Sequence, residues 1–120
     1  MRILVCGSRH YHEQEQLFAI LDKEVEESPY DPVIIITGMA KGADTLAWMW
    51  AKSRKMICEE YPADWEKHGR SAGPIRNRQM LKEGNPDLVI AFLAPDSRGT
   101  KDMVKAATEA GIQIKIINIK

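Results

Sequence analysis

Five short hydrophobic segments alternate along the chain with segments in which apolar residues recur at helical spacing. A short hydrophobic run is typical of a β-strand, whereas apolar residues three or four positions apart indicate an amphipathic helix. The expected strands are Arg2–Cys6, Val33–Thr37, Met56–Tyr61, Asp87–Phe92 and Ile112–Ile119. Regular alternation of strands and helices predicts an α/β fold, with a parallel sheet covered by helices on both faces.

The strand segments differ in how apolar they are, and this difference predicts their order. Three are continuously apolar, which is typical of strands covered on both faces: Ile3–Cys6, Val33–Ile36 and Leu88–Phe92. The other two alternate, with apolar positions on one face at Met56, Cys58, Ile112, Ile114 and Ile116. Because one-sided strands belong at sheet edges, the sequence predicts a five-stranded, mainly parallel sheet in the order 3-2-1-4-5. A chain of 120 residues fits a single domain over residues 1–120.

Four helices are expected between these strands. Their apolar stripes are Leu17, Ile20, Leu21 and Val25; then Ala43, Leu46, Ala47, Trp50 and Ala51; and, in the last helix, Met103, Val104, Ala107 and Ala110. A shorter helix is expected from about Gly73 to Glu83. It overlaps Pro62–Arg78, a polar, arginine-rich stretch that we interpret as a long loop. Because long loops inside small domains are usually functional, this stretch is expected to help build a site.

The segments that follow the first four strands are expected to meet at one rim. In an open parallel sheet, ligands bind beyond the carboxyl ends of the strands, where the strand order reverses, here between the first and fourth strands. Residues 7–12, 38–44, 62–78 and 94–102 together hold eight Lys and Arg against five Asp and Glu, although the whole chain has 17 of each. A neutral protein with a positive rim suits a small anionic ligand better than a long polyanion.

Glycines at two of these turns suggest where an anion would bind. Gly42 and Gly99 each stand where a loop passes into a helix, so backbone N–H groups there could approach an oxygen anion. Thr100 adds a hydroxyl group, and Arg9 and Arg76 add positive charge. We therefore expect a phosphate group at this rim, although glycine also serves in ordinary turns.

Other rim residues have two interpretations each. Asp44 is either a first-turn acid that favours the helix dipole or a ligand of a ribose hydroxyl. His68 is either a structural residue or a proton carrier. Trp65 either stacks on a base or fixes the loop to the domain. Trp48 faces away from the apolar stripe of its helix, and this position is our reason for expecting a homodimer.

Several common site motifs are missing from the chain. It has no Gly-x-x-x-x-Gly-Lys-Ser/Thr loop, Gly-x-Gly-x-x-Gly fingerprint, Gly-x-Ser-x-Gly elbow or His-Glu-x-x-His pair. It also lacks a Cys-x-x-Cys pair or histidine cluster, so we expect neither a metal nor a cofactor. No apolar run approaches the ~20 residues of a membrane span, and no secretory signal is evident. We therefore expect a cytoplasmic protein with no membrane partner.

Motifs spread over nearly the whole chain resemble a known family. In order, they are Gly7-Ser8-Arg9, Thr37–Asp44, Pro62–Trp65 with His68-Gly69, Ala72–Asn77 and Arg98-Gly99-Thr100. Together they resemble the YspA-like branch of the SLOG superfamily. The resemblance implies a Rossmann-like three-layer sandwich whose strand-end loops bind a nucleotide or a nucleotide-derived ligand.

The resemblance indicates a ligand class rather than a reaction. In that superfamily, DNA-processing protein A binds single-stranded DNA, whereas Lonely Guy enzymes cleave the N-glycosidic bond of nucleoside monophosphates. The Lonely Guy motif Pro-Gly-Gly-x-Gly-Thr-x-x-Glu is incomplete here, because Met103 stands where the glutamate would be. Asp102 lies one position earlier, which is about 100° around a helix.

The leading expectation is a sensor or processing protein that binds a small nucleotide-type ligand. The expected ligand-binding residues are Gly7, Ser8, Arg9, Gly38, Lys41, Gly42, Asp44, Trp65, Arg76, Asn77, Arg98, Gly99 and Thr100. The alternative is a phosphoribohydrolase-like enzyme, with Asp44, Asp64 or Asp102 as the carboxylate and His68 as a proton carrier. Binding of single-stranded nucleic acid, with Trp65 as a stacking platform, is less favoured by the neutral net charge.

Overall fold

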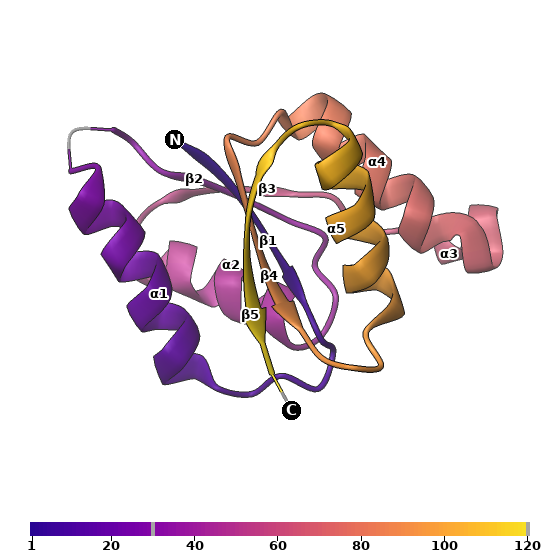
Figure 1. Cartoon of the computed structure of the whole chain (residues 1–120), viewed down its shortest axis with the longest axis horizontal. Helices are drawn as coiled ribbons and strands as arrows, with labels where there is room; N and C mark the ends of the chain where they lie inside the picture. The colour runs from indigo at the N-terminus through magenta and orange to yellow at the C-terminus, as the bar shows by residue number, and fades with distance from the viewer. Residues whose placement is uncertain (30, 120) are drawn as a thin grey trace.

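The computed structural model describes residues 1–29 and 31–119, which form one sheet between two layers of helices (Figure 1). The strands are β1 (Arg2–Gly7), β2 (Ile34–Thr37), β3 (Ile57–Glu60), β4 (Leu88–Leu93) and β5 (Gln113–Asn118). The helices are α1 (Gln14–Glu27), α2 (Ala43–Ser53), α3 (Trp65–His68), α4 (Ala72–Gly84) and α5 (Arg98–Glu109), with the 3₁₀ turn η1 at Gly69–Ser71.

The sheet has the strand order β3-β2-β1-β4-β5, and its neighbouring strands pair in parallel. Each strand begins and ends within one residue of the expected position. The predicted α/β fold and strand order are therefore confirmed. The order reverses between β1 and β4, where a parallel sheet leaves a crevice for a ligand.

Alternate residues of the central strands build two separate cores. In β1, Ile3 and Val5 belong to the cluster packed against α1 and α2, whereas Leu4 and Cys6 belong to the cluster that includes residues of α4 and α5. This division follows from strand geometry, because successive side chains point to opposite faces. Figure 1 shows the two helix layers on opposite sides of the sheet. Both faces of the central strands are covered, which explains their continuous apolar sequence.

The edge strands are more exposed to solvent than the central ones, as their alternating sequences indicate. Ile57 in β3 is 63% exposed and Ile116 in β5 is 45% exposed. Trp48 in α2 is half-buried, and Lys52 Nζ lies 5.7 Å from the centroid of its ring. The homodimer expected from Trp48 stays a prediction. Among the described helices, none is long and apolar enough to cross a membrane.

The interpretation of Pro62–Arg78 as one long loop is wrong. Most of this stretch is helical, because α3 and η1 lead directly into α4, which begins within one residue of the expected start. Asp64 caps α3 by accepting a hydrogen bond from the N–H of Lys67 at 3.1 Å. A helix of four residues is too short to show an apolar periodicity, so hydrophobic spacing could not reveal α3.

Gly42 provides a test of how tightly α2 is held against β1. A Cβ atom added there would lie 2.2 Å from the carbonyl oxygen of Ser8, and the residue has a φ of 81°. We expect Gly42→Ala to lower the free energy of unfolding by more than about 2 kcal/mol, because backbone strain and steric overlap add together. Urea denaturation of the two proteins measures this difference.

Gly111→Ala is the matched control for that substitution. Gly111 has a similar φ of 75°, but a Cβ atom there would meet no atom within 4 Å. This variant should lose only the cost of backbone strain, about 1 kcal/mol. Equal losses of unfolding free energy in the two variants would mean that overlap of the added Cβ with Ser8 costs nothing beyond backbone strain.

Candidate functional site

A cavity of about 430 Å³ lies beyond the carboxyl ends of β1 and β4, where the strand order reverses. We call it the larger cavity. Its volume is within the range of small-molecule sites. It brings together many of the residues expected at the rim: Gly7, Ser8, Arg9, Asp44, Trp65, Arg76, Asn77, Arg98, Gly99, Thr100 and Asp102. The structure therefore gathers segments far apart in sequence into one concave surface.

A second cavity of about 320 Å³ adjoins the first and is called the smaller cavity. Gly38 and Lys41, two further expected site residues, line it together with Met39, Pro62 and Ala63. Four residues line both cavities and form the boundary between them: Arg9, Ala40, Trp65 and Arg76. The rim thus consists of two neighbouring compartments.

Gly42 is not placed as the sequence suggested. It lines neither cavity, because its backbone lies against the Ser8–Arg9 segment. The N–H of Ala43, in the first turn of α2, donates a hydrogen bond to the carbonyl oxygen of Ser8 at 3.3 Å. The expected anion-binding turn at Gly42 is therefore a packing contact between two backbone segments.

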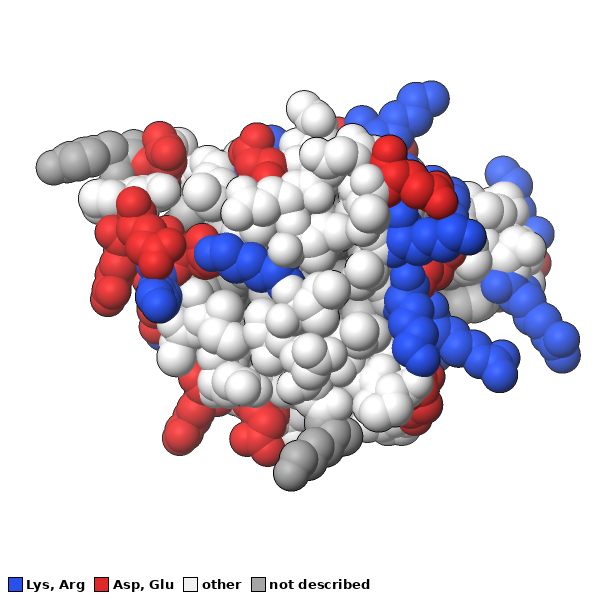
Figure 2. Space-filling view, in the orientation of Figure 1, with Lys and Arg blue, Asp and Glu red and all other residues white. Residues whose placement is uncertain are grey.

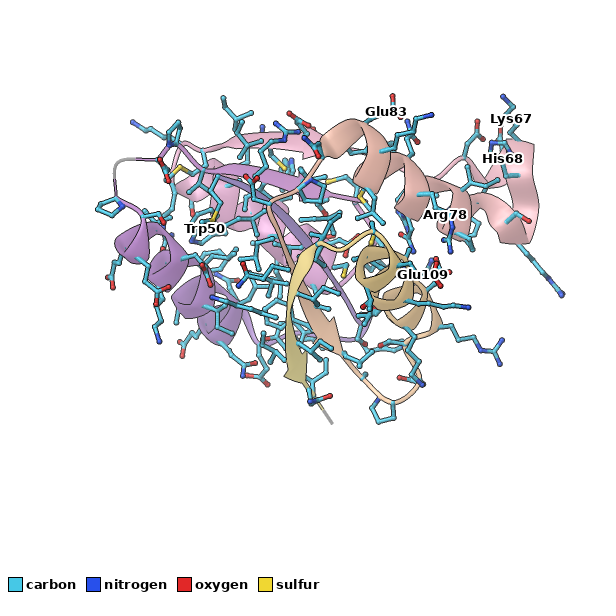
Figure 3. The ribbon with its side chains drawn as sticks, turned by 45° about the horizontal axis from the view of Figure 1, so that its top comes forward. Trp50, Lys67, His68, Arg78, Glu83 and Glu109 are labelled. Atoms are coloured by element: carbon cyan, nitrogen blue, oxygen red, sulfur yellow. The ribbon has the colours of Figure 1, made fainter. Side chains whose placement is uncertain are left out.

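Two of the four candidate catalytic residues also lie outside both cavities. Asp64 caps α3 with its carboxylate, and His68 is the last residue of the same helix. Figure 3 shows Lys67 and His68 at the outer end of α3, away from the sheet. The structure brings only Asp44 and Asp102 into the larger cavity, so the proton-carrier role expected for His68 has no geometric support.

The first turn of α5 offers an anion-binding surface to the larger cavity. The N–H groups of Gly99 and Thr100 donate no hydrogen bond to any described residue. Both residues line the larger cavity, and a Cβ atom at Gly99 would meet no atom within 4 Å. Free N–H groups and the helix dipole together favour an anion at such a position. This is the turn predicted from Gly99-Thr100.

Asp44 is a buried carboxyl group at the wall of the larger cavity, only 5% exposed. Its Oδ2 accepts a hydrogen bond from the N–H of Ala40 at 3.3 Å. Burial raises the pKa of Asp44 to about 6, although the charges of Arg76 and Arg9 act in the opposite direction. The carboxyl group therefore changes protonation close to neutral pH.

Arg76 connects α4 to the turn after β2. Its Nη1 donates a hydrogen bond to the carbonyl oxygen of Gly38 at 2.7 Å, and its Nε donates one to Asn77 Oδ1 at 3.2 Å. Burial lowers the pKa of Arg76, whereas the charge of Asp44 raises it. The guanidinium group thus remains a fixed positive charge at the boundary of the two cavities.

Asp102 holds α4 and α5 together. Its Oδ2 accepts hydrogen bonds from Arg78 Nη1 at 2.7 Å and from Asn77 Nδ2 at 3.0 Å. Burial raises the pKa of Asp102, but these two hydrogen bonds outweigh burial and leave the pKa below its usual value. Figure 3 shows Arg78 on α4, on the side of that helix that faces α5. Asp102 is therefore an ionised, engaged group rather than a free acid.

Several residues that line the larger cavity were not among the expected ligand-binding residues, although all but Cys6 lie in segments expected to form the rim. They include Cys6, His10, Arg70, Asp96 and Ser97. Most directly adjoin a predicted motif, so extension of each motif by one or two residues would have found them. Figure 2 shows Lys and Arg gathered on the side of the molecule occupied by α3, α4 and α5, with acidic residues over α1. Within residues 1–29 and 31–119, no group of three His, Cys, Asp or Glu is arranged to hold a metal ion.

Residues 1–68 match the model of a family described as the YspA, cpYpsA-related SLOG family. This match covers more than half of the chain. The chain belongs to this family. The resemblance inferred from its motifs is thus confirmed. The SLOG chain is also 35% identical over 118 residues to the Gene 61 protein of Mycobacterium phage D29, which covers 94% of this chain and 93% of that protein.

Solved structures share the fold of this SLOG chain. DNA processing protein A from Streptococcus pneumoniae has a TM-score of 0.73 at 19% identity over 96% of this chain. The chain spans 49% of that protein's length. The structure of TM1055 has a TM-score of 0.68 at 14% identity, covering 94% of this chain and 71% of that one. At these identities the comparison establishes the α/β fold.

The pKa of Asp44 predicts a pH dependence of stability. Because folding raises this pKa from 3.8 to about 6, the folded state holds a proton that the unfolded state releases between these values. This proton stabilises the folded state fully below pH 3.8, and the stabilisation is lost as the pH rises through about 6. Between about pH 4 and pH 6.5, Asp44→Asn should gain about 2 to 3 kcal/mol of unfolding free energy relative to the wild type.

Urea denaturation of both proteins at a series of pH values measures this change. Taking the difference between the two proteins cancels the titration of groups that they share. A difference that stayed flat across the series would show that Asp44 titrates normally in the folded protein.

Proposed function

We propose that this SLOG protein binds a nucleotide or nucleotide-derived ligand in the larger cavity, as a sensor or processing protein. The observation that carries the proposal is the first turn of α5, where Gly99 and Thr100 line a cavity of about 430 Å³ and their N–H groups donate no hydrogen bond to a described residue. Membership of the SLOG family supports a nucleotide-related role.

The arrangement supplies a partner for each part of a nucleotide. The N–H groups of Gly99 and Thr100 would hold a phosphate, with Arg98 adding positive charge beside them. Asp44 is placed to accept a hydrogen bond from a sugar hydroxyl. Trp65 is 47% exposed, and a base would stack on its ring beside the Arg9 guanidinium, whose Cζ lies 5.5 Å from the ring centroid. The wall of the larger cavity carries four arginines and three aspartates, so it offers partners both for a phosphate and for sugar hydroxyls.

Gly99→Glu tests the phosphate position without disturbing the fold. A Cβ atom at this position would meet no atom within 4 Å, and an acid in the first turn of a helix favours the helix dipole. The variant should therefore keep or slightly raise the stability of the protein while its carboxylate repels the phosphate. We expect the thermal shift produced by a nucleotide to disappear.

The matched control is Thr108→Glu, which adds the same charge to an exposed position near the other end of α5. The panel contains adenosine and guanosine mono-, di- and triphosphates, NAD, ADP-ribose and cyclic nucleotides. A ligand about 100-fold above its Kd adds ~2.7 kcal/mol, which a thermal-shift scan detects. A full shift in Gly99→Glu would place the phosphate elsewhere, and a panel without any shift in the wild type would count against nucleotide binding.

A hydrolase acting on the N-glycosidic bond is the second candidate. The observation that favours it is the buried carboxyl of Asp44, whose pKa of about 6 suits proton transfer near neutral pH. If the protein releases free base from a bound nucleotide, Asp44→Asn should slow that release by at least about 100-fold. Chromatographic detection of the free base measures the rate of release. Undiminished release by Asp44→Asn would exclude this residue, and Asp102→Asn then tests the other candidate carboxylate that lines the cavity.

A further inference from the structure

The smaller cavity is lined by basic residues without acidic ones, unlike the larger cavity. Arg9, Lys41 and Arg76 line it, and none of the described residues around it is Asp or Glu. The larger cavity, in contrast, includes the carboxyl groups of three aspartates: Asp44, Asp96 and Asp102. Because the smaller cavity has positive charge and no acidic residue, it favours a second anion, separate from the one in the larger cavity.

The two guanidinium groups at the boundary also repel each other. The charge of Arg9 contributes to lowering the pKa of Arg76, although the charge of Asp44 raises it by more. Arg9 is exposed, with its Cζ 5.5 Å from the ring centroid of Trp65. Arg76 is held by the carbonyl oxygen of Gly38. Negative charge placed beside Arg9 and Arg76 would relieve this repulsion.

A single phosphate at the first turn of α5 would leave the smaller cavity without a negative charge. The turn of Gly99 and Thr100 lines only the larger cavity, whereas Lys41 lines only the smaller one. With volumes of about 430 and 320 Å³, both compartments are of the size that holds a small organic group. Trp65 lines both and offers an aromatic face at the point where a ligand would pass from one to the other.

We infer that the ligand is a dinucleotide that spans both cavities. One unit lies in the larger cavity, with its phosphate at the first turn of α5. The phosphate of the second unit lies in the smaller cavity near Arg9 and Lys41, and a base stacks on Trp65. The inference rests on the proposed function, because it places the first unit in the same site.

Isothermal titration calorimetry with mono- and dinucleotides tests the inference. The probes are AMP, GMP and the 5′-phosphorylated dinucleotides pApA and pGpG, at about 150 mM salt to screen distant charges. The dinucleotide should bind at least about tenfold more tightly than the matching mononucleotide, because its second phosphate binds with no further loss of overall rotational and translational freedom.

Lys41→Gln separates the two compartments. The ratio of dinucleotide to mononucleotide affinity should fall about fivefold, the loss expected for one exposed charge contact. Lys67→Gln removes the same charge from α3, outside both cavities, and should leave the ratio at its wild-type value. Gly99→Glu should abolish binding of both probes.

The outcomes distinguish this inference from the proposed function. Equal affinities for mono- and dinucleotide would overturn the inference and leave nucleotide binding intact, and so would equal effects of Lys41→Gln and Lys67→Gln on the ratio. If neither probe binds the wild type, the inference fails, and the nucleotide panel decides whether the proposed function fails with it. A single-stranded oligonucleotide of about 12 nucleotides supplies the last comparison. Affinity that keeps rising with length, with steep salt dependence, would identify nucleic acid as the ligand and overturn the dinucleotide.

Discussion

The site depends on the close approach of two backbone segments, the turn after β1 and the start of α2. Gly42 lies so near the carbonyl oxygen of Ser8 that no other residue fits there, and the N–H of Ala43 donates a hydrogen bond to the same oxygen. This contact fixes α2 at the end of β1. Asp44 is consequently buried at the cavity wall, and Arg9 is directed across the rim toward Trp65.

Arg76 provides the second constraint, since it organises the boundary between the cavities. Its guanidinium group reaches across to Gly38, where a Cβ atom would lie only 2.4 Å from Nη1. The absence of a side chain at Gly38 is therefore what lets the arginine cross between α4 and β2. Burial in this position keeps the positive charge near the carboxyl of Asp44, and the partly compensated pair gives the larger cavity its electrostatic character.

The first helical turns of α5 carry no acid at the position of the Lonely Guy glutamate. Met103, at that position, is fully buried in the core between the sheet and α5. Asp102, next to it, is held by Arg78 and Asn77. The residues after Gly99 and Thr100 thus pack the helix and connect it to α4, while the free N–H groups remain available. Position 103 therefore contributes packing rather than a carboxylate, and the free N–H groups of the turn carry the anion site that we propose.

The sequence by itself determined the strands, their order and the rim at which the site lies. Continuous apolar runs belong only in covered strands, and parallel strands must bring their carboxyl ends to one edge. It did not determine α3, because four residues carry no periodicity. Only the tertiary structure decided that Gly42 is a packing residue, that His68 lies outside the cavities and that Asp44 is buried. These properties arise from contacts between residues distant in sequence, which local patterns cannot specify.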